Sequence, residues 1–150
     1  MADPPGGAPH DEEQFLRHEV EMASTPADLA TRVIALADLL VRERRGLDEA
    51  AQLYDRALAA ADDDAPATAR YHAHVGRARV ARLAGDTDEQ VRHLDAAIEV
   101  CERLGEWQAV PDLLLLRGVL EVDAGRLDDA RALLVRALSL AEAQGDEHQA

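Results

Sequence analysis

The sequence is poor in the residues that build β-sheets and disulfide frameworks. Aromatic residues make up 3% of the 150 positions, and Cys101 is the only cysteine. Because aromatic residues are among those that pleated sheets prefer, their scarcity beside abundant Ala and Leu favours helix packing. A single cysteine can form neither an internal disulfide nor a zinc cluster, so we expect a reducing compartment and place the protein in the cytoplasm.

Long apolar runs and an excess of basic charge are also lacking. No apolar run reaches the roughly 18 residues that a membrane-spanning helix needs, and the acidic, Pro/Gly-rich start MADPPGGAPHDEEQ is unlike a secretory signal. With 30 acidic and 16 basic residues, the net charge of −14 repels phosphate backbones and anionic lipid headgroups. We therefore expect neither nucleic acid nor a membrane as a partner.

Catalytic and metal-binding motifs are missing as well. The chain has no Gly-rich phosphate loop and no His-Glu-x-x-His, and its only serines, Ser24 and Ser139, lie outside any nucleophile elbow. His72 and His74 lie two residues apart, a spacing at which side chains on a helix do not face each other. We predict a protein that is not an enzyme and that has no metal site and no cofactor.

What the chain does contain is one segment repeated three times. The copies begin at Arg45, Ala84 and Ala124, and the corresponding positions Ala50, Gln90 and Ala130 are 40 residues apart. A period of this length is typical of arrays of helical hairpins. Since 47% of the residues are hydrophobic, the chain can bury the core of one domain. We predict a single all-α domain over residues 11–150, preceded by a disordered tail at residues 1–10.

Capping residues divide this domain into helices. Thr25 offers an N-cap oxygen to a helix that begins at Pro26, and glycines end the first helix of each hairpin. Asp64 and Thr87 are the predicted caps of the two helices of the second hairpin. The prediction is a short helix from Asp11 to about Ser24, followed by hairpins at about 26–61, 65–104 and 106–144.

The start of the third hairpin is less regular, because it contains a proline. A helix that began at Glu106 would place Pro111 past its first turn and lose a hydrogen bond there. We expect either a kink at this point or a helix that begins near Val110.

The three copies also share a pattern of small and large residues: Ala50/Tyr54/Ala57, Gln90/Leu94/Ala97 and Ala130/Leu134/Ala137. This pattern resembles the tetratricopeptide repeat in its longer form, although Gln90 and Asp38 stand where small residues are expected. The resemblance covers about Pro26 to Gln144. It implies an α-solenoid of three stacked hairpins whose first helices line a concave groove. Independently of the family, small residues allow two helices to approach closely, while Leu40, Val80 and Leu120 fill the space between them.

The resemblance implies that partner contacts lie along this groove. Matching positions on the three first helices give Arg32, Leu39 and Arg42; His72, Val75, Arg79 and Arg82; and Leu115, Val119 and Val122. The second set lies on one helical face, so Arg79 and Arg82 belong to a basic stripe in an acidic protein. We predict a protein or peptide partner with acidic and apolar side chains. The alternative is that these arginines are solvated and pair with nearby Asp and Glu.

The last helix has more leucines than one neighbouring helix can cover. They are Leu133, Leu134, Leu138 and Leu140. We predict that they form an isologous contact in a homodimer, with a cut from a longer array as the alternative. The function expected is that of an interaction scaffold or adaptor. The second hypothesis is a peptide- or metabolite-responsive sensor belonging to a larger transcriptional or signalling regulator.

Overall fold

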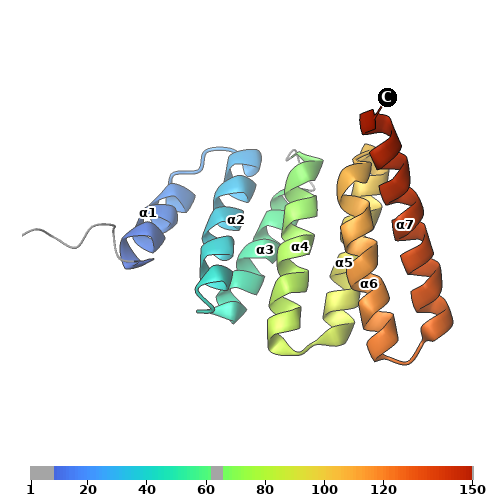
Figure 1. Ribbon diagram of the computed structural model, residues 1–150. Coiled ribbons are helices and arrows are strands. Elements are labelled where there is room, and N and C mark those ends of the chain that lie inside the picture. Colours follow the sequence, from blue (N-terminus) through green and yellow to red (C-terminus); the bar gives the residue numbers. More distant parts are fainter. Residues whose placement is uncertain (1–8, 62–65, 150) are drawn as a thin grey trace, which may run out of the picture.

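The computed structural model describes residues 9–61 and 66–149, and within these ranges its regular elements are all helices, without a strand. The all-α prediction is therefore confirmed. Figure 1 shows the elements in order: α1 (Pro9–Glu21), α2 (Pro26–Arg42), α3 (Leu47–Ala61), α4 (Ala67–Ala84), α5 (Thr87–Leu104), the short 3-10 helix η1 (Trp107–Ala109), α6 (Val110–Asp123) and α7 (Leu127–Gln149). Among these helices, none combines the length and the apolar character that a bilayer crossing requires.

Several helix ends follow from the capping residues. The Thr25 side chain accepts a hydrogen bond from the Asp28 backbone N–H at 3.1 Å, and Pro26 opens α2 as predicted. Gly85 ends α4 with φ +74°, a left-handed conformation that costs glycine little. Of the two alternatives at Pro111, the structure has the start at Val110, where proline occupies the first turn of α6.

Other boundaries differ from the prediction. α1 begins at Pro9, two residues before the predicted Asp11. The N-cap of α5 is Asp86 and not Thr87, because the Asp86 carboxylate accepts the Glu89 backbone N–H. α7 continues through Gly145 to Gln149, since one glycine costs a helix only about 1 kcal/mol. The predicted cap Asp64 and the tail at residues 1–8 lie outside the described residues.

Consecutive helices pack as three pairs, α2 with α3, α4 with α5, and α6 with α7. α4 also packs against both α2 and α3, and α6 packs against α5, so the pairs form the row seen in Figure 1. The small residues are buried where they were expected, with Ala57 and Ala97 both 0% exposed. Leu40 and Val80 are buried as well, which confirms that they fill the space between helices.

Tyr54 explains why Asp38 stands where a small residue was expected. The Tyr54 side chain is 0% exposed, and its hydroxyl donates a hydrogen bond to the Asp38 carboxylate on α2. Its ring lies against Gly76 of α4, where an added Cβ would come within 2.2 Å of the ring. Burial, with the contribution of Asp38, raises the Tyr54 pKa, so the hydroxyl stays protonated as a donor. The Tyr54 side chain thus joins α2, α3 and α4.

Candidate functional site

A hollow lined mainly by arginines lies between α2 and α4. Its volume is about 450 Å³, and its lining includes Arg42, Arg44, Arg79 and Arg82, with Asp38 as the only acidic residue. α4 supplies Arg79 and Arg82 on adjacent turns of one helical face. We call this hollow the arginine hollow. Its charge is opposite in sign to the net charge of −14 of the whole chain.

Arg79 and Arg82, like Arg44, are charges of this hollow that are uncompensated among the described residues. Within residues 9–61 and 66–149 neither guanidinium has an ion-pair partner, and both residues are exposed. Arg42 differs, because Glu12 of α1 lies 3.2 Å from it. Arg117 on α6 is a clearer contrast, since Asp95 and Glu121 hold it at 2.6 and 2.8 Å. In the predicted alternative, Arg79 and Arg82 are solvated and paired with nearby Asp and Glu: both are exposed, and the described residues show no such pair.

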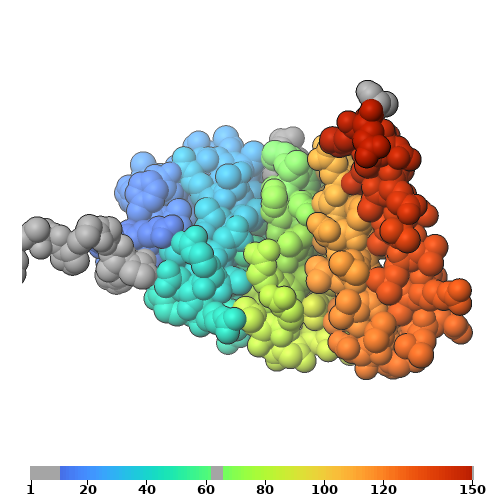
Figure 2. All heavy atoms as spheres, in the orientation of Figure 1, coloured from blue at the N-terminus to red at the C-terminus, as the bar shows by residue number. Residues whose placement is uncertain are grey.

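A second, more apolar hollow adjoins the first across α4. Its volume is about 290 Å³, and Arg79 and Arg82 line it again, now with apolar residues of α4, α5 and α6: Val75, Ala78, Leu94, Leu113 and Leu116. Figure 2 shows α4 (green) between α2 (blue) and α6 (orange) on this face of the molecule. The same two guanidiniums therefore border a cationic surface on one side and an apolar surface on the other.

The apolar character continues along α6. Leu115, Val119 and Val122 are 50%, 47% and 46% exposed. They follow one another at four- and three-residue spacing and so share one helical face. These are the residues predicted for the third hairpin, and the structure leaves all three accessible.

Not every predicted residue lies on an accessible surface. Leu39 is only 2% exposed and belongs to the core, so its prediction as a partner contact is wrong: the face of α2 that bears it is covered. Arg32 is bound by α1, with Glu19 at 3.2 Å and Asp28 of its own helix at 2.8 Å. The packing of α1 on α2 thus occupies part of the surface that was assigned to a partner.

His72 lies apart from the arginine hollow. It is exposed, its ring contacts that of Tyr71, and both line a separate hollow of about 260 Å³ beside η1. Cys101 and Leu104 also line this third hollow. His72 thus stays on the face of α4 that bears Arg79, seven residues further on, but it lines this third hollow and not the arginine hollow.

Sequence reasoning missed Arg44, which joins the arginine hollow from the turn after α2. Its φ of +53° is unusual for a residue other than glycine. This conformation turns the chain back toward α3 and leaves Arg44 beside Arg42 in the lining. Helical periodicity could not identify it, because Arg44 is not on a helix.

The leucines predicted for self-association separate into two groups. Leu133 and Leu140 are half-buried and pack against the core formed with α5 and α6. Leu134 is also half-buried. It lies so close to Gly118 that a Cβ added at Gly118 would be 2.7 Å from the Leu134 side chain. Only Leu138 is largely exposed, at 60%. The prediction for Leu133 and Leu140 is thus corrected, because α7 turns these two residues toward its neighbours, whereas Leu134 and Leu138 line a hollow between α6 and α7.

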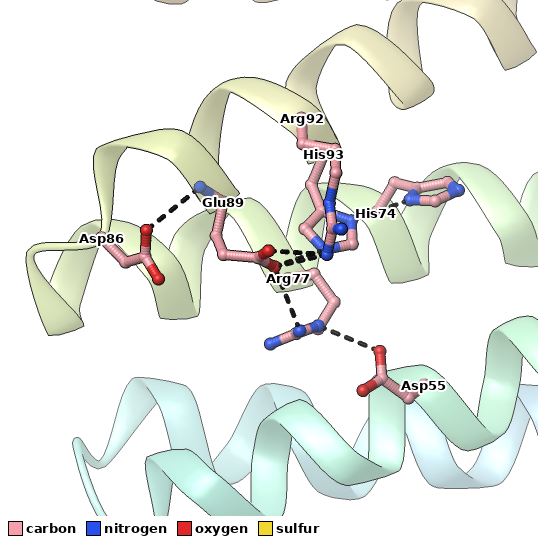
Figure 3. Close-up of polar contacts among 7 residues, drawn as sticks. All are labelled: Asp55, His74, Arg77, Asp86, Glu89, Arg92 and His93. Carbon is pink, nitrogen blue, oxygen red and sulfur yellow. Dashed lines mark hydrogen bonds and ion pairs between the residues drawn. The ribbon is translucent and has the colours of Figure 1, made fainter.

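A second polar cluster was not predicted and joins α3, α4 and α5. Figure 3 shows His74 of α4 next to His93 of α5. Their Nδ1 atoms are 3.1 Å apart, and the two rings are tilted by 36°. Nε2 of His93 lies 3.4 Å from the Glu89 carboxylate. The Arg77 guanidinium lies between this carboxylate and that of Asp55 on α3, at 3.4 Å from Glu89 and 3.0 Å from Asp55.

One hydrogen bond joins the two rings of this cluster. A hydrogen bond between two Nδ1 atoms requires one donor and one acceptor. Nε2 of His93 is buried and makes no hydrogen bond to the described residues, although the Glu89 carboxylate lies 3.4 Å from it. Burial lowers the pKa of His74 to about 4 and also lowers that of His93, so both rings are neutral at pH 7. Across the described ranges, no three His, Cys, Asp or Glu side chains are placed to hold a metal ion.

Comparison with models of known protein families yields no match, and comparison with curated proteins yields none either. The assignment of a function therefore depends on the surfaces described above.

Proposed function

We propose that this protein is a scaffold or adaptor of tetratricopeptide-like architecture, which binds a peptide segment of a partner protein along α2, α4 and α6. The repeat of 40 residues in the sequence supports this architecture. The row of paired helices in Figure 1 agrees with it. A surface that runs along three helices suits an extended or helical peptide better than a compact ligand.

The observation that carries the proposal is the position of Arg79 and Arg82 in two adjoining hollows. A guanidinium without an internal partner is available for paired hydrogen bonds to a carboxylate. The apolar side chains of the second hollow and of α6 offer contacts for the remainder of the peptide. The preferred ligand therefore has acidic residues followed by apolar ones.

Selection from a random peptide library displayed on phage tests this proposal. The immobilised wild-type protein is expected to enrich peptides that combine Asp or Glu with Leu, Ile or Phe. The double variant Arg79→Ala, Arg82→Ala removes both charges and is expected to lose the acidic preference and bind the selected peptides at least roughly tenfold more weakly. Enrichment of peptides without acidic residues, or equal binding by the variant, would contradict the proposal.

A matched control keeps the number of lost charges the same. Arg56 and Arg103 are exposed arginines outside both hollows, on α3 and α5. The variant Arg56→Ala, Arg103→Ala is therefore expected to bind selected peptides as the wild type does. If the control variant weakened binding equally, the effect would come from net charge and not from the hollows.

The proposal assigns no chemical step and no cofactor to the protein and places it in the cytoplasm. Cys101 is its only thiol, and burial raises the pKa of this group. A buried thiol with a raised pKa is a poor nucleophile and behaves as a small apolar side chain. The strongly acidic composition supports a protein partner over a nucleic acid or a membrane.

The third hollow favours one alternative, the binding of a small molecule by a sensor. Tyr71, Cys101, Leu104 and Ala109 give it a mainly apolar lining, and its 260 Å³ is near the lower limit of small-ligand sites. Thermal unfolding in the presence of a metabolite collection would test this role. A compound that stabilises the wild type and fails to stabilise a Leu104→Glu variant would support the sensor over the scaffold.

A further inference from the structure

The outer face of α7 has an exposed stripe that is not used by the arginine hollow or the hollow beside it. The stripe consists of Arg131, Val135, Leu138 and Glu142, all exposed. Their spacing of four, three and four residues keeps them on one side of the helix. α7 lies at the end of the row of helices and packs mainly against α6, which leaves this side open (Figure 1).

Both apolar members of the stripe are unusually accessible. Val135 is 57% exposed and Leu138 is 60% exposed. Beside them lies a hollow of about 330 Å³ between α6 and α7, whose lining is apolar apart from Arg131: Val122, Leu127, Ala130, Leu134, Val135 and Leu138. An exposed apolar strip beside an apolar hollow is a surface that another helix can cover.

The charges at the two ends of the stripe identify the occupant. Arg131 and Glu142 make no ion pair with any residue of the described ranges. The spacing of the stripe is the same in both directions along α7, but the order of charges is reversed. From the C-terminal end it runs acidic, apolar, apolar, basic. Two copies of α7 placed antiparallel therefore bring Arg131 opposite the partner's Glu142 and Val135 opposite the partner's Leu138.

We propose that this protein forms a two-fold symmetric homodimer through antiparallel pairing of α7 with α7 of a second copy. The pairing is isologous, so each contact occurs twice: two ion pairs flank a centre made of two valines and two leucines. The apolar side chains of one α7 enter the hollow between α6 and α7 of the other. No lining residue of the arginine hollow or of the hollow beside it takes part, so the inference does not depend on the proposed function. Val122 of α6 is the one residue that both proposed surfaces use.

The size of the stripe sets the strength expected of the dimer. Four apolar side chains and two exposed ion pairs form an interface at the small end of the range for proteins. We expect a dissociation constant on the order of 10–100 μM at moderate salt, weakened by high ionic strength.

Charge reversal at the ends of the stripe tests both the partner and the orientation. Arg131→Glu and Glu142→Arg each place like charges opposite each other twice, and each is expected to weaken the dimer at least roughly thirtyfold. An equimolar mixture of the two variants restores opposite charges at both positions and should form a heterodimer of wild-type affinity. Sedimentation velocity at protein concentrations from roughly 1 to 500 μM measures the dissociation constants of the two variants and of their mixture.

A charge reversal elsewhere on α7 serves as the control for these variants. Glu147→Arg reverses a charge on another side of α7 and should leave the dimer intact. A wild type that stays monomeric throughout the range overturns the proposal, as do higher oligomers, which would indicate a heterologous contact. A dimer that tolerates both reversals, or single variants that fail to recover on mixing, overturns the antiparallel pairing. Circular dichroism at pH 7 checks that each variant is folded.

Discussion

The histidine pair between α4 and α5 makes the fold sensitive to mild acid. Both rings are neutral at pH 7, and protonation of either one would break the Nδ1 to Nδ1 hydrogen bond of 3.1 Å or add a charge to a half-buried site. The neighbouring charges do not cancel this effect. Arg70, Arg77 and Arg92 oppose protonation, while Asp55 and Glu89 favour it only in part.

The magnitude follows from the pKa of His74, which burial lowers from 6.5 to about 4 in the folded protein. The unfolded chain therefore takes up the proton first, and the stability that depends on neutral His74 is lost as the pH falls from about 6.5 to 4. Because the ring is only half-buried and solvent screens it, the loss is on the order of 1 kcal/mol between pH 7 and 5. This is a measurable part of the ~5–15 kcal/mol typical of a domain.

Urea unfolding followed by circular dichroism at pH 7, 6 and 5 measures this loss. The variant His74→Gln removes one of the two titrating rings and should weaken the dependence, leaving the part that comes from His93, at a cost of about 1 kcal/mol at pH 7 for the lost hydrogen bond. His72→Gln, an exposed ring two residues away, should keep the wild-type dependence. Carboxylates held by arginines contribute only at lower pH, because Glu121, bound by Arg117 and Arg126, has its pKa lowered to about 2. A wild-type midpoint that does not change between pH 7 and 5 would refute the reasoning.

Three further predictions concern packing, capping and the thiol. Gly76→Ala should lose about 2 kcal/mol in urea unfolding, because the new Cβ meets the Tyr54 ring; in a Tyr54→Leu background the same change should be neutral or stabilising. Thr25→Ala removes the N-cap of α2 and should cost about 1 kcal/mol, whereas Thr25→Ser should retain most of it. Cys101, only 2% exposed, should react with a thiol reagent at the rate of unfolding, and a stoichiometric reaction within seconds in native buffer would contradict its burial.

The two proposed binding surfaces lie at different places along the row of helices. The arginine hollow is formed by α2 and α4, and the exposed stripe lies on α7. A dimer paired through α7 would thus carry two arginine hollows, one in each copy. For a partner with two acidic segments, this arrangement raises the effective concentration of the second segment once the first is bound.

The sequence by itself determined the helices and most of their ends. The 40-residue period, the cap Thr25, the stop Gly85 and the proline at position 111 are local signals, and each acts through backbone hydrogen bonds within a few residues. Where local signals competed, the result differed by one or two residues, as at Asp86 and Thr87.

Only the tertiary structure decided which sides of these helices face solvent. Leu39 and Val119 occupy corresponding positions two repeats apart, yet Leu39 is 2% exposed and Val119 is 47% exposed. His74 and His93 are 19 residues apart in the chain and meet only because α4 packs on α5. Burial and pairing depend on which neighbour covers each face, and a periodic sequence pattern states that a face is apolar without stating what lies against it.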